Sequence, residues 1–198
     1  MGRNFYRLVH TVFKPIFGFC YLNKATGLEN LPEDGAFVLC ANHLSGLDPI
    51  CIAARLPQKI DLAFLAKKEL FENKFLKLLI DALGAIPVDR GGADIAAIRA
   101  SMQALKDGKC LLIFPQGTRS RDNEQTQMEG GIALIALRAG VPVIPVYVDG
   151  PYRAFRKTPL VIGEPIDLSD FGRKCDSATI AQATERIEKA IWSLKEKV

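Results

Sequence analysis

The residues best suited to catalysis lie in one short segment, Asn42-His43-Leu44-Ser45-Gly46-Leu47-Asp48-Pro49. His43 carries an imidazole, which can take up a proton near neutral pH, and Asp48 follows five positions later. Ser45 and Gly46 let the chain turn between them, so the Asp48 carboxylate can reach one ring nitrogen and fix the tautomer. The other nitrogen can then accept a proton from an attacking hydroxyl. The spacing therefore predicts a general base with an orienting carboxylate.

The same segment has a structural interpretation. Asp48 precedes Pro49, which is typical of a helix start, so Asp48 could cap a helix whose first position Pro49 fills. Capping would not prevent the carboxylate from orienting His43. The chain has two histidines and no cluster of His, Cys or carboxylates at metal-ligand spacing, so we expect no metal site. No GxSxG motif is present, which favours direct attack by an acceptor over a serine nucleophile.

A second polar segment, Phe114-Pro115-Gln116-Gly117-Thr118-Arg119-Ser120-Arg121, concentrates hydrogen-bond donors and positive charge. Gly117 permits close approach of the backbone, and the guanidinium groups of Arg119 and Arg121 can bind an oxyanion through two parallel hydrogen bonds. Taken alone, the segment is equally consistent with a solvated loop whose arginines pair with surface carboxylates. As a binding site, its chemistry suits a phosphate.

Both segments follow short apolar runs that are typical of strands buried on both faces. Helical patterns alternate with these runs, which predicts an α/β domain with a mostly parallel mixed sheet flanked by helices. Ligands of such sheets usually bind beyond the carboxyl ends of the strands, where both polar segments are expected. A last amphipathic helix around 180–194 is expected to pack on the domain. The expected strands are 36–41, 62–66, 85–88, 110–114 and 142–148, and the expected helices are 49–56, 67–83, 93–105 and 131–139.

Basic residues are concentrated at the N-terminus. The chain has 26 Lys and Arg against 22 Asp and Glu, a net charge of +4, and residues 1–24 hold four basic residues and no acid. The remainder is neutral by count, which disfavours a nucleic-acid partner. Residues 1–24 are aromatic and aliphatic but too polar to span a bilayer, and they lack a signal-peptide cleavage site. They predict an amphipathic helix at a membrane interface, and a helix packed on its own domain is the alternative.

Composition and cysteine spacing also indicate the number of domains and the cellular compartment. We expect one catalytic domain over 25–198, because no linker or repeat divides it. The five cysteines show no CxxC spacing, and Cys40, Cys51 and Cys110 lie in apolar runs where a reduced thiol packs as a small hydrophobe. A reducing compartment is therefore expected. Together with the interfacial helix, this predicts peripheral attachment to the cytoplasmic face of the cell membrane.

Four segments of the chain, in order, resemble the sequence blocks of the glycerolipid acyltransferases, and most closely those of the bacterial 1-acylglycerol-3-phosphate acyltransferases. The resemblance spans 36–148. It implies a glycerol-phosphate acyltransferase-like fold, a lysophosphatidate-like membrane lipid as acceptor, and acyl-CoA or acyl-carrier protein as donor, without a cofactor. The segments are 42–48, 84–90, 114–120 and 141–146.

The resemblance also implies roles for individual residues. His43 is expected to be the general base and Asp48 its orienting partner, while Arg90 and Arg119 hold the acceptor phosphate in a pocket shaped by the neighbouring loop. Lys67 is a further candidate for anion contact, although an exposed lysine at a helix start explains it equally well. The expected substrate-binding residues are Lys67, Arg90, Gln116, Gly117, Thr118 and Arg119.

Two positions depart from the pattern of the family. Gln116 stands where the family has glutamate, and an amide keeps a carbonyl acceptor but loses the negative charge. Glu129 stands where the family often has lysine. Two alternatives therefore stay open. One is a thioesterase that uses the same base to activate water, and the other is a non-catalytic lipid-binding homologue in which Gln116 has replaced a required carboxylate.

Overall fold

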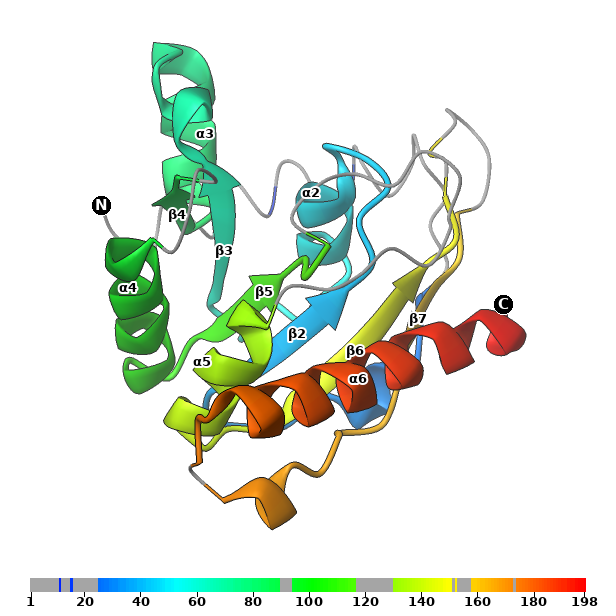
Figure 1. The fold of residues 1–198 in the computed structure, drawn as a ribbon. Coiled ribbons are helices and arrows are strands. Elements are labelled where there is room, and N and C mark those ends of the chain that lie inside the picture. The colour runs from blue at the N-terminus through cyan, green and yellow to red at the C-terminus, as the bar shows by residue number, and fades with distance from the viewer. Residues whose placement is uncertain are drawn as a thin grey trace.

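The centre of the fold is a seven-stranded sheet with the order β1-β7-β6-β2-β5-β3-β4 (Figure 1). The structure is a computed structural model and describes residues 11, 15, 25–89, 94–116, 130–150, 152, 158–172 and 174–198. The strands are β1 (Ala25–Thr26), β2 (Phe37–Ala41), β3 (Leu62–Lys67), β4 (Ala85–Val88), β5 (Cys110–Ile113), β6 (Val143–Val148) and β7 (Leu160–Ile162).

Most strands of the sheet run in one direction. β2 pairs in parallel with both β5 and β6, and β3 pairs in parallel with β4 and β5. At one side of the sheet, β7 and its parallel partner β1 run in the opposite direction, and β7 pairs antiparallel with β6. The predicted mostly parallel mixed sheet is therefore confirmed. Because β2 lies between β5 and β6, the loop that follows it is flanked by the loops of two neighbours.

Helices cover both faces of the sheet (Figure 1). Phe37 and Leu39 of β2 point into a core cluster shared with α2 and α3, whereas Val38 and Cys40 point into a cluster shared with α4, α5 and α6. This burial on both sides explains why the strand is apolar throughout. The helices are α2 (Asp48–Ala53), α3 (Lys74–Ala82), α4 (Ile95–Lys106), α5 (Gly131–Ala139) and α6 (Ser177–Ser193), with 3-10 helices η1 (Leu28–Asn30), η2 (Lys68–Phe71), η3 (Ser169–Phe171) and η4 (Leu194–Lys197).

The expected single helix over 67–83 is wrong. Lys67 closes β3, η2 follows, and α3 begins only at Lys74. The break lies at Asn73, whose side chain accepts hydrogen bonds from the backbone N–H groups of Phe75 and Leu76 and so caps α3. The segment η2–α3 consequently forms an arm that rises beyond the end of β3 (Figure 1).

The N-terminal segment falls outside this description. Apart from Thr11 and Pro15, residues 1–24 are not among the described residues, so the expected interfacial helix stays a prediction. Within the ranges given above, no helix is long and apolar enough to cross a bilayer. The four described cysteines are free thiols, three of them buried, as expected for Cys40, Cys51 and Cys110.

Candidate active site

Asn42 anchors the loop that follows β2. It is fully buried, its Nδ2 donates to the Val148 carbonyl oxygen at 2.9 Å, and its Oδ1 accepts from the Val148 backbone N–H at 2.7 Å. Both hydrogen-bonding groups of the amide are thus used on one residue at the end of β6. The loop is therefore fixed to a neighbouring strand immediately before His43. Asn42 was recognised from the sequence as part of the motif, but its role as an anchor was not predicted.

His43 and Asp48 form a buried hydrogen-bonded pair. His43 Nδ1 lies 2.7 Å from Asp48 Oδ2, and the two residues are 6% and 0% exposed. Asp48 Oδ2 also accepts the backbone N–H groups of Leu44 at 2.7 Å and Ser45 at 2.8 Å. Because Asp48 Oδ2 accepts two backbone N–H groups, it acts as an acceptor toward His43 as well. His43 Nδ1 therefore carries the hydrogen. In the neutral ring Nε2 is then the acceptor, as the sequence predicted.

Asp48 does not cap α2 as its position before Pro49 had indicated. Leu47 occupies the cap position without a side-chain hydrogen bond, Asp48 is the first helical residue, and Pro49 is the second. The reason is that the carboxylate turns back toward the loop that precedes it instead of forward along the helix. The helix start thus fixes the backbone of Asp48, while its side chain is committed to His43.

The second polar segment meets this loop through Gln116. The Gln116 side chain is buried, and its Oε1 accepts the backbone N–H of His43 at 2.7 Å. An N–H group can only donate, so this contact needs the carbonyl oxygen that glutamine shares with glutamate. Phe114 stacks on the His43 ring, with centroids 4.2 Å apart and 26° between the planes. The described part of the second segment, 114–116, therefore lies beside the His43 loop at one edge of the sheet, as predicted.

Tyr152 is a further residue beside the pair that the sequence did not indicate. Burial raises the pKa of its phenol well above the usual value, and the negative charge of Asp48 and then Cys51 raise this pKa further. The phenol therefore stays protonated next to Asp48. No motif points to Tyr152, because it follows β6 by four residues in a stretch without periodicity.

The remaining predicted site residues are not brought into contact with His43 by the described structure. Lys67 is exposed at the end of β3, and its Nζ pairs with Glu69 Oε1 at 2.9 Å, as expected for an ordinary surface lysine. Arg90, Gly117, Thr118 and Arg119 lie outside the described residues. Their proposed contacts with phosphate are therefore untested.

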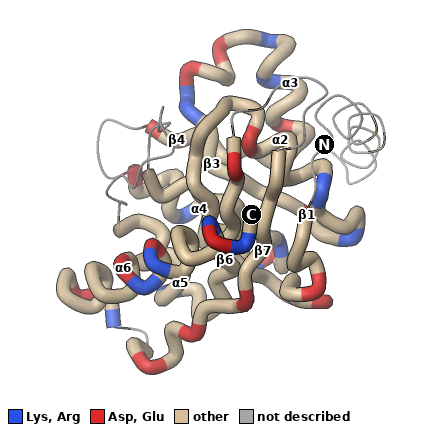
Figure 2. The backbone as a smooth tube through the Cα atoms, turned by 90° about the vertical axis from the view of Figure 1, so that its right-hand side faces the viewer, with Lys and Arg blue, Asp and Glu red and all other residues tan. Residues whose placement is uncertain are grey.

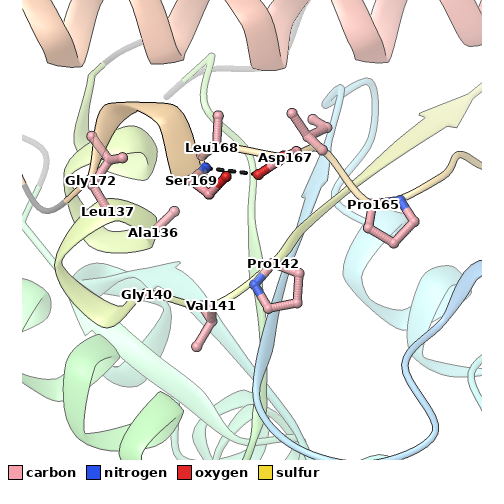
Figure 3. A pocket seen from close by; sticks show the side chains of 11 residues that line it. Ala136, Leu137, Gly140, Val141, Pro142, Pro165, Asp167, Leu168, Ser169 and Gly172 are labelled. Carbon is pink, nitrogen blue, oxygen red and sulfur yellow. Dashed lines mark hydrogen bonds between the residues drawn. The ribbon is translucent and has the colours of Figure 1, made fainter.

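A separate cavity of about 540 Å³ lies beside the start of β6 (Figure 3). Because β6 runs parallel to β2, this cavity is at the opposite ends of the strands from His43, which follows β2. Pro142 and Leu168 line it, and the Ser169 backbone N–H donates to Asp167 Oδ1 at 2.8 Å along its wall. The cavity holds no pair comparable to His43 and Asp48. Over the described part of the chain, no group of three His, Cys, Asp or Glu side chains could hold a metal ion.

A buried histidine–carboxylate pair at the carboxyl ends of the strands of a mostly parallel sheet is an arrangement suited to activating a hydroxyl. Comparison with known proteins narrows the class. The acyltransferase family model matches residues 23–149, and the chain belongs to that family.

Individual relatives agree with this assignment. The chain is 33% identical to the 1-acyl-sn-glycerol-3-phosphate acyltransferase of Bacillus subtilis, over 88% of this chain and 89% of that protein. It is 32% identical to the Streptococcus pneumoniae protein of the same name, over 83% of this chain and 62% of that protein. The crystal structure of the 1-acyl-sn-glycerophosphate (LPA) acyltransferase PlsC from Thermotoga maritima superposes with a TM-score of 0.75 at 29% identity, covering 96% of this chain and 79% of that one.

Proposed function

We propose that the chain transfers a fatty acyl group from an acyl thioester to the free hydroxyl of a 1-acylglycerol-3-phosphate, a step of phospholipid biosynthesis. The observation that carries this function is the buried pair in which Asp48 holds His43 Nδ1 at 2.7 Å. The two bacterial relatives described above bear the name of this activity. The donor is acyl-CoA or acyl-carrier protein, which deliver the same thioester.

The proposed reaction depends on the tautomer of His43, in which Nε2 can accept a proton. His43 Nε2 removes the proton from the acceptor hydroxyl as its oxygen attacks the thioester carbonyl. The ring then carries a positive charge, which the Asp48 carboxylate stabilises. Collapse of the tetrahedral intermediate breaks the carbon–sulfur bond, and the imidazolium returns its proton to the departing thiolate. Phe114 covers one face of the ring and Asn42 anchors its loop, so the base keeps its direction during the transfer.

The contact made by Gln116 favours a catalytic protein over the non-catalytic lipid-binding homologue. Its contact with the His43 backbone uses a carbonyl oxygen at 2.7 Å, and a glutamine provides this oxygen as well as a glutamate does. The substitution therefore leaves the support of the base intact. The thioesterase alternative uses the same base, and product identity separates it from transfer.

The acceptor phosphate is proposed to bind Arg90 and Arg119, with Gly117 and Thr118 shaping the pocket and Lys67 as an outer contact. The pairing of β3 with β4 supports this proposal, because Lys67 is the register partner of Val88 and Arg90 follows Val88 by two residues. A phosphate bound there would be close to the edge where His43 lies. We also propose that residues 1–24 form the interfacial helix that attaches the 25–198 domain peripherally to the cytoplasmic face of the membrane.

Mass spectrometry of the products tests the function. Purified protein is incubated with acyl-CoA or acyl-carrier protein and a panel of lysolipids, and we expect a diacylglycerol phosphate that requires the lysophosphatidate acceptor. His43→Ala should lower turnover at least about 10³-fold while the circular dichroism spectrum is unchanged. Free fatty acid formed equally with and without acceptor would establish a thioesterase. Turnover by His43→Ala near that of the wild type would refute the assignment of the base.

A further inference from the structure

The arm formed by η2 and α3 displays apolar side chains to solvent. Phe75 is 88% exposed, Leu78 is 47% exposed and Leu70 is 36% exposed. A single exposed leucine is common on protein surfaces, but a phenylalanine with almost its whole side chain in water is not. Phe75 and Leu78 are three residues apart on one helix, so they present neighbouring side chains on the same face.

These side chains are not the core-facing side of the helix. Leu76 and Leu79 pack against the core and Ile80 is buried, so α3 already has an apolar face that holds it to the domain. The outer face of such a helix is normally polar. On α3 the outer face instead combines Phe75 and Leu78 with exposed charges, and nothing in the described part of the chain covers it.

Exposed apolar side chains are concentrated at the edge that carries the active site. Six large apolar residues are exposed among the described residues, and four of them belong to the arm or to the start of α4, beyond the ends of β3 and β4. His43 follows β2 at this same edge. Figures 1 and 2 both show the arm extending past the ends of the strands. The four residues are Leu70, Phe75, Leu78 and Ile95.

Charges on the arm indicate what kind of surface it meets. Residues 67–81 contain four lysines and three acids, and both types occur along the arm (Figure 2). Two of the acids are paired, because Glu69 binds Lys67 and Asp81 binds Lys77. Lys74 adjoins Phe75 and has no ion pair within the described residues. An apolar tip with a modest positive excess matches the headgroup layer of an anionic bilayer.

We propose that the η2–α3 arm docks on an anionic lipid bilayer, inserting Phe75 and Leu78 into the interface with Lys74 at the headgroups. Docking at this edge would turn the loop of His43 toward the membrane. In that respect the inference rests on the proposed function, since a lipid acceptor must reach His43 from the bilayer. It is separate from the attachment proposed for residues 1–24.

Vesicle binding by the full chain tests the proposal. The double variant Phe75→Ser/Leu78→Ser is compared with Leu28→Ser/Val198→Ser, which removes two exposed apolar side chains away from the arm. On vesicles of phosphatidylcholine and phosphatidylglycerol, we expect the arm variant to bind about tenfold more weakly and the control to bind like the wild type. Lys74→Glu should weaken binding to these vesicles about fivefold and leave binding to pure phosphatidylcholine unchanged. Equal binding by the arm variant and its control would overturn the proposal.

Fluorescence provides a test that does not depend on a loss of vesicle binding. Phe75→Trp should show a blue-shifted emission when anionic vesicles are added, beyond the change seen for the wild type, whose sole tryptophan is Trp192. An unshifted emission would contradict insertion. Light scattering on the arm variant shows whether the face instead holds a second copy of the chain. A change of oligomeric state with unchanged vesicle binding would overturn the proposal in favour of self-association.

Turnover separates the failure of this inference from failure of the proposed function. With a water-soluble short-chain lysophosphatidate, the arm variant should keep wild-type turnover, because the chemistry does not need the bilayer. Weakened vesicle binding together with no acyl transfer by the wild type would uphold the docking surface and refute the proposed function. Normal acyl transfer by the wild type, together with vesicle binding that is unchanged in the arm variant, would uphold the proposed function and refute the docking surface.

Discussion

The loop from Asn42 to Asp48 and the η2–α3 arm depart from the usual distribution of side chains in opposite ways. In the loop, Asn42, His43 and Asp48 are polar and buried, and each makes hydrogen bonds to a defined partner. On the arm, Phe75 and Leu78 are apolar and exposed. A buried polar group is tolerated when it is satisfied, and an exposed apolar group when a partner covers it. The contrast separates the region proposed to perform chemistry from the region proposed to dock on a bilayer.

The largest effect is expected at Asp48. Asp48→Asn keeps an oxygen for the backbone N–H groups of Leu44 and Ser45 but removes the negative charge that stabilises protonated His43. We expect kcat to fall about 10³-fold, measured by steady-state turnover. Asp34→Asn, in an exposed turn, serves as the control and should leave kcat unchanged. A loss smaller than tenfold for Asp48→Asn would mean that the buried pair is structural.

The next effect concerns the anchor of the loop. Asn42→Ala removes two hydrogen bonds and leaves the buried Val148 N–H and carbonyl groups without their partner, so the free energy of unfolding should fall by about 2 kcal/mol. Turnover should fall about tenfold at temperatures where the variant is folded. Asn30→Ala, which loses one hydrogen bond to Ile162, should be destabilised by about 1 kcal/mol with normal turnover. Normal turnover by a folded Asn42→Ala protein would show that the anchor does not position His43.

A smaller effect is expected at Gln116. Gln116→Ala removes the acceptor of the His43 backbone N–H and should lower kcat about tenfold. Gln116→Glu keeps an oxygen acceptor, so its kcat should stay within about threefold of wild type. Gln103→Ala, on the exposed side of α4, is the control. If Gln116→Glu were as impaired as Gln116→Ala, the carbonyl contact would not explain the role of this residue.

The smallest effect tests the arm itself. Phe75→Ala should change the free energy of unfolding by no more than about 0.5 kcal/mol, because the side chain is 88% exposed and contributes nothing to the core. Ile80→Ala on the buried face of the same helix should cost about 3 kcal/mol. Chemical denaturation measures both. A large destabilisation by Phe75→Ala would show that this side chain packs on the domain and is not free for docking.

Local patterns predicted the parts of the fold that depend on neighbouring residues. The expected helix 131–139 coincides with α5, and the expected strand 85–88 coincides with β4, because apolar periodicity and short buried runs are local signals. The contact between His43 and Asp48 was also predictable, because five residues separate them. The strand reversal at β7 was not predictable, since three residues carry no information on direction. The break at Asn73 was missed because the apolar pattern continues through it.

Contacts between distant segments could not be derived from the sequence. Gln116 meets the backbone of His43 across 73 residues, and Asn42 meets Val148 across 106. No spacing rule predicts such pairs. The phosphate-binding role of Arg90 came from resemblance alone, and that of Arg119 came from resemblance and from the oxyanion chemistry of its segment. Both roles remain proposals, because neither residue is among the described residues.

The anchoring of Asn42 on Val148 also bears on when the enzyme becomes competent during its synthesis. A nascent chain that has emerged only as far as α5 already contains His43, Asp48 and Gln116, but it lacks β6, on which the loop is fixed. Contacts of such long sequence separation form late, because the intervening chain must first be ordered. We therefore expect the catalytic loop to be ordered only after β6 has joined the sheet beside β2. An emerging or truncated chain would remain inactive until that strand is in place.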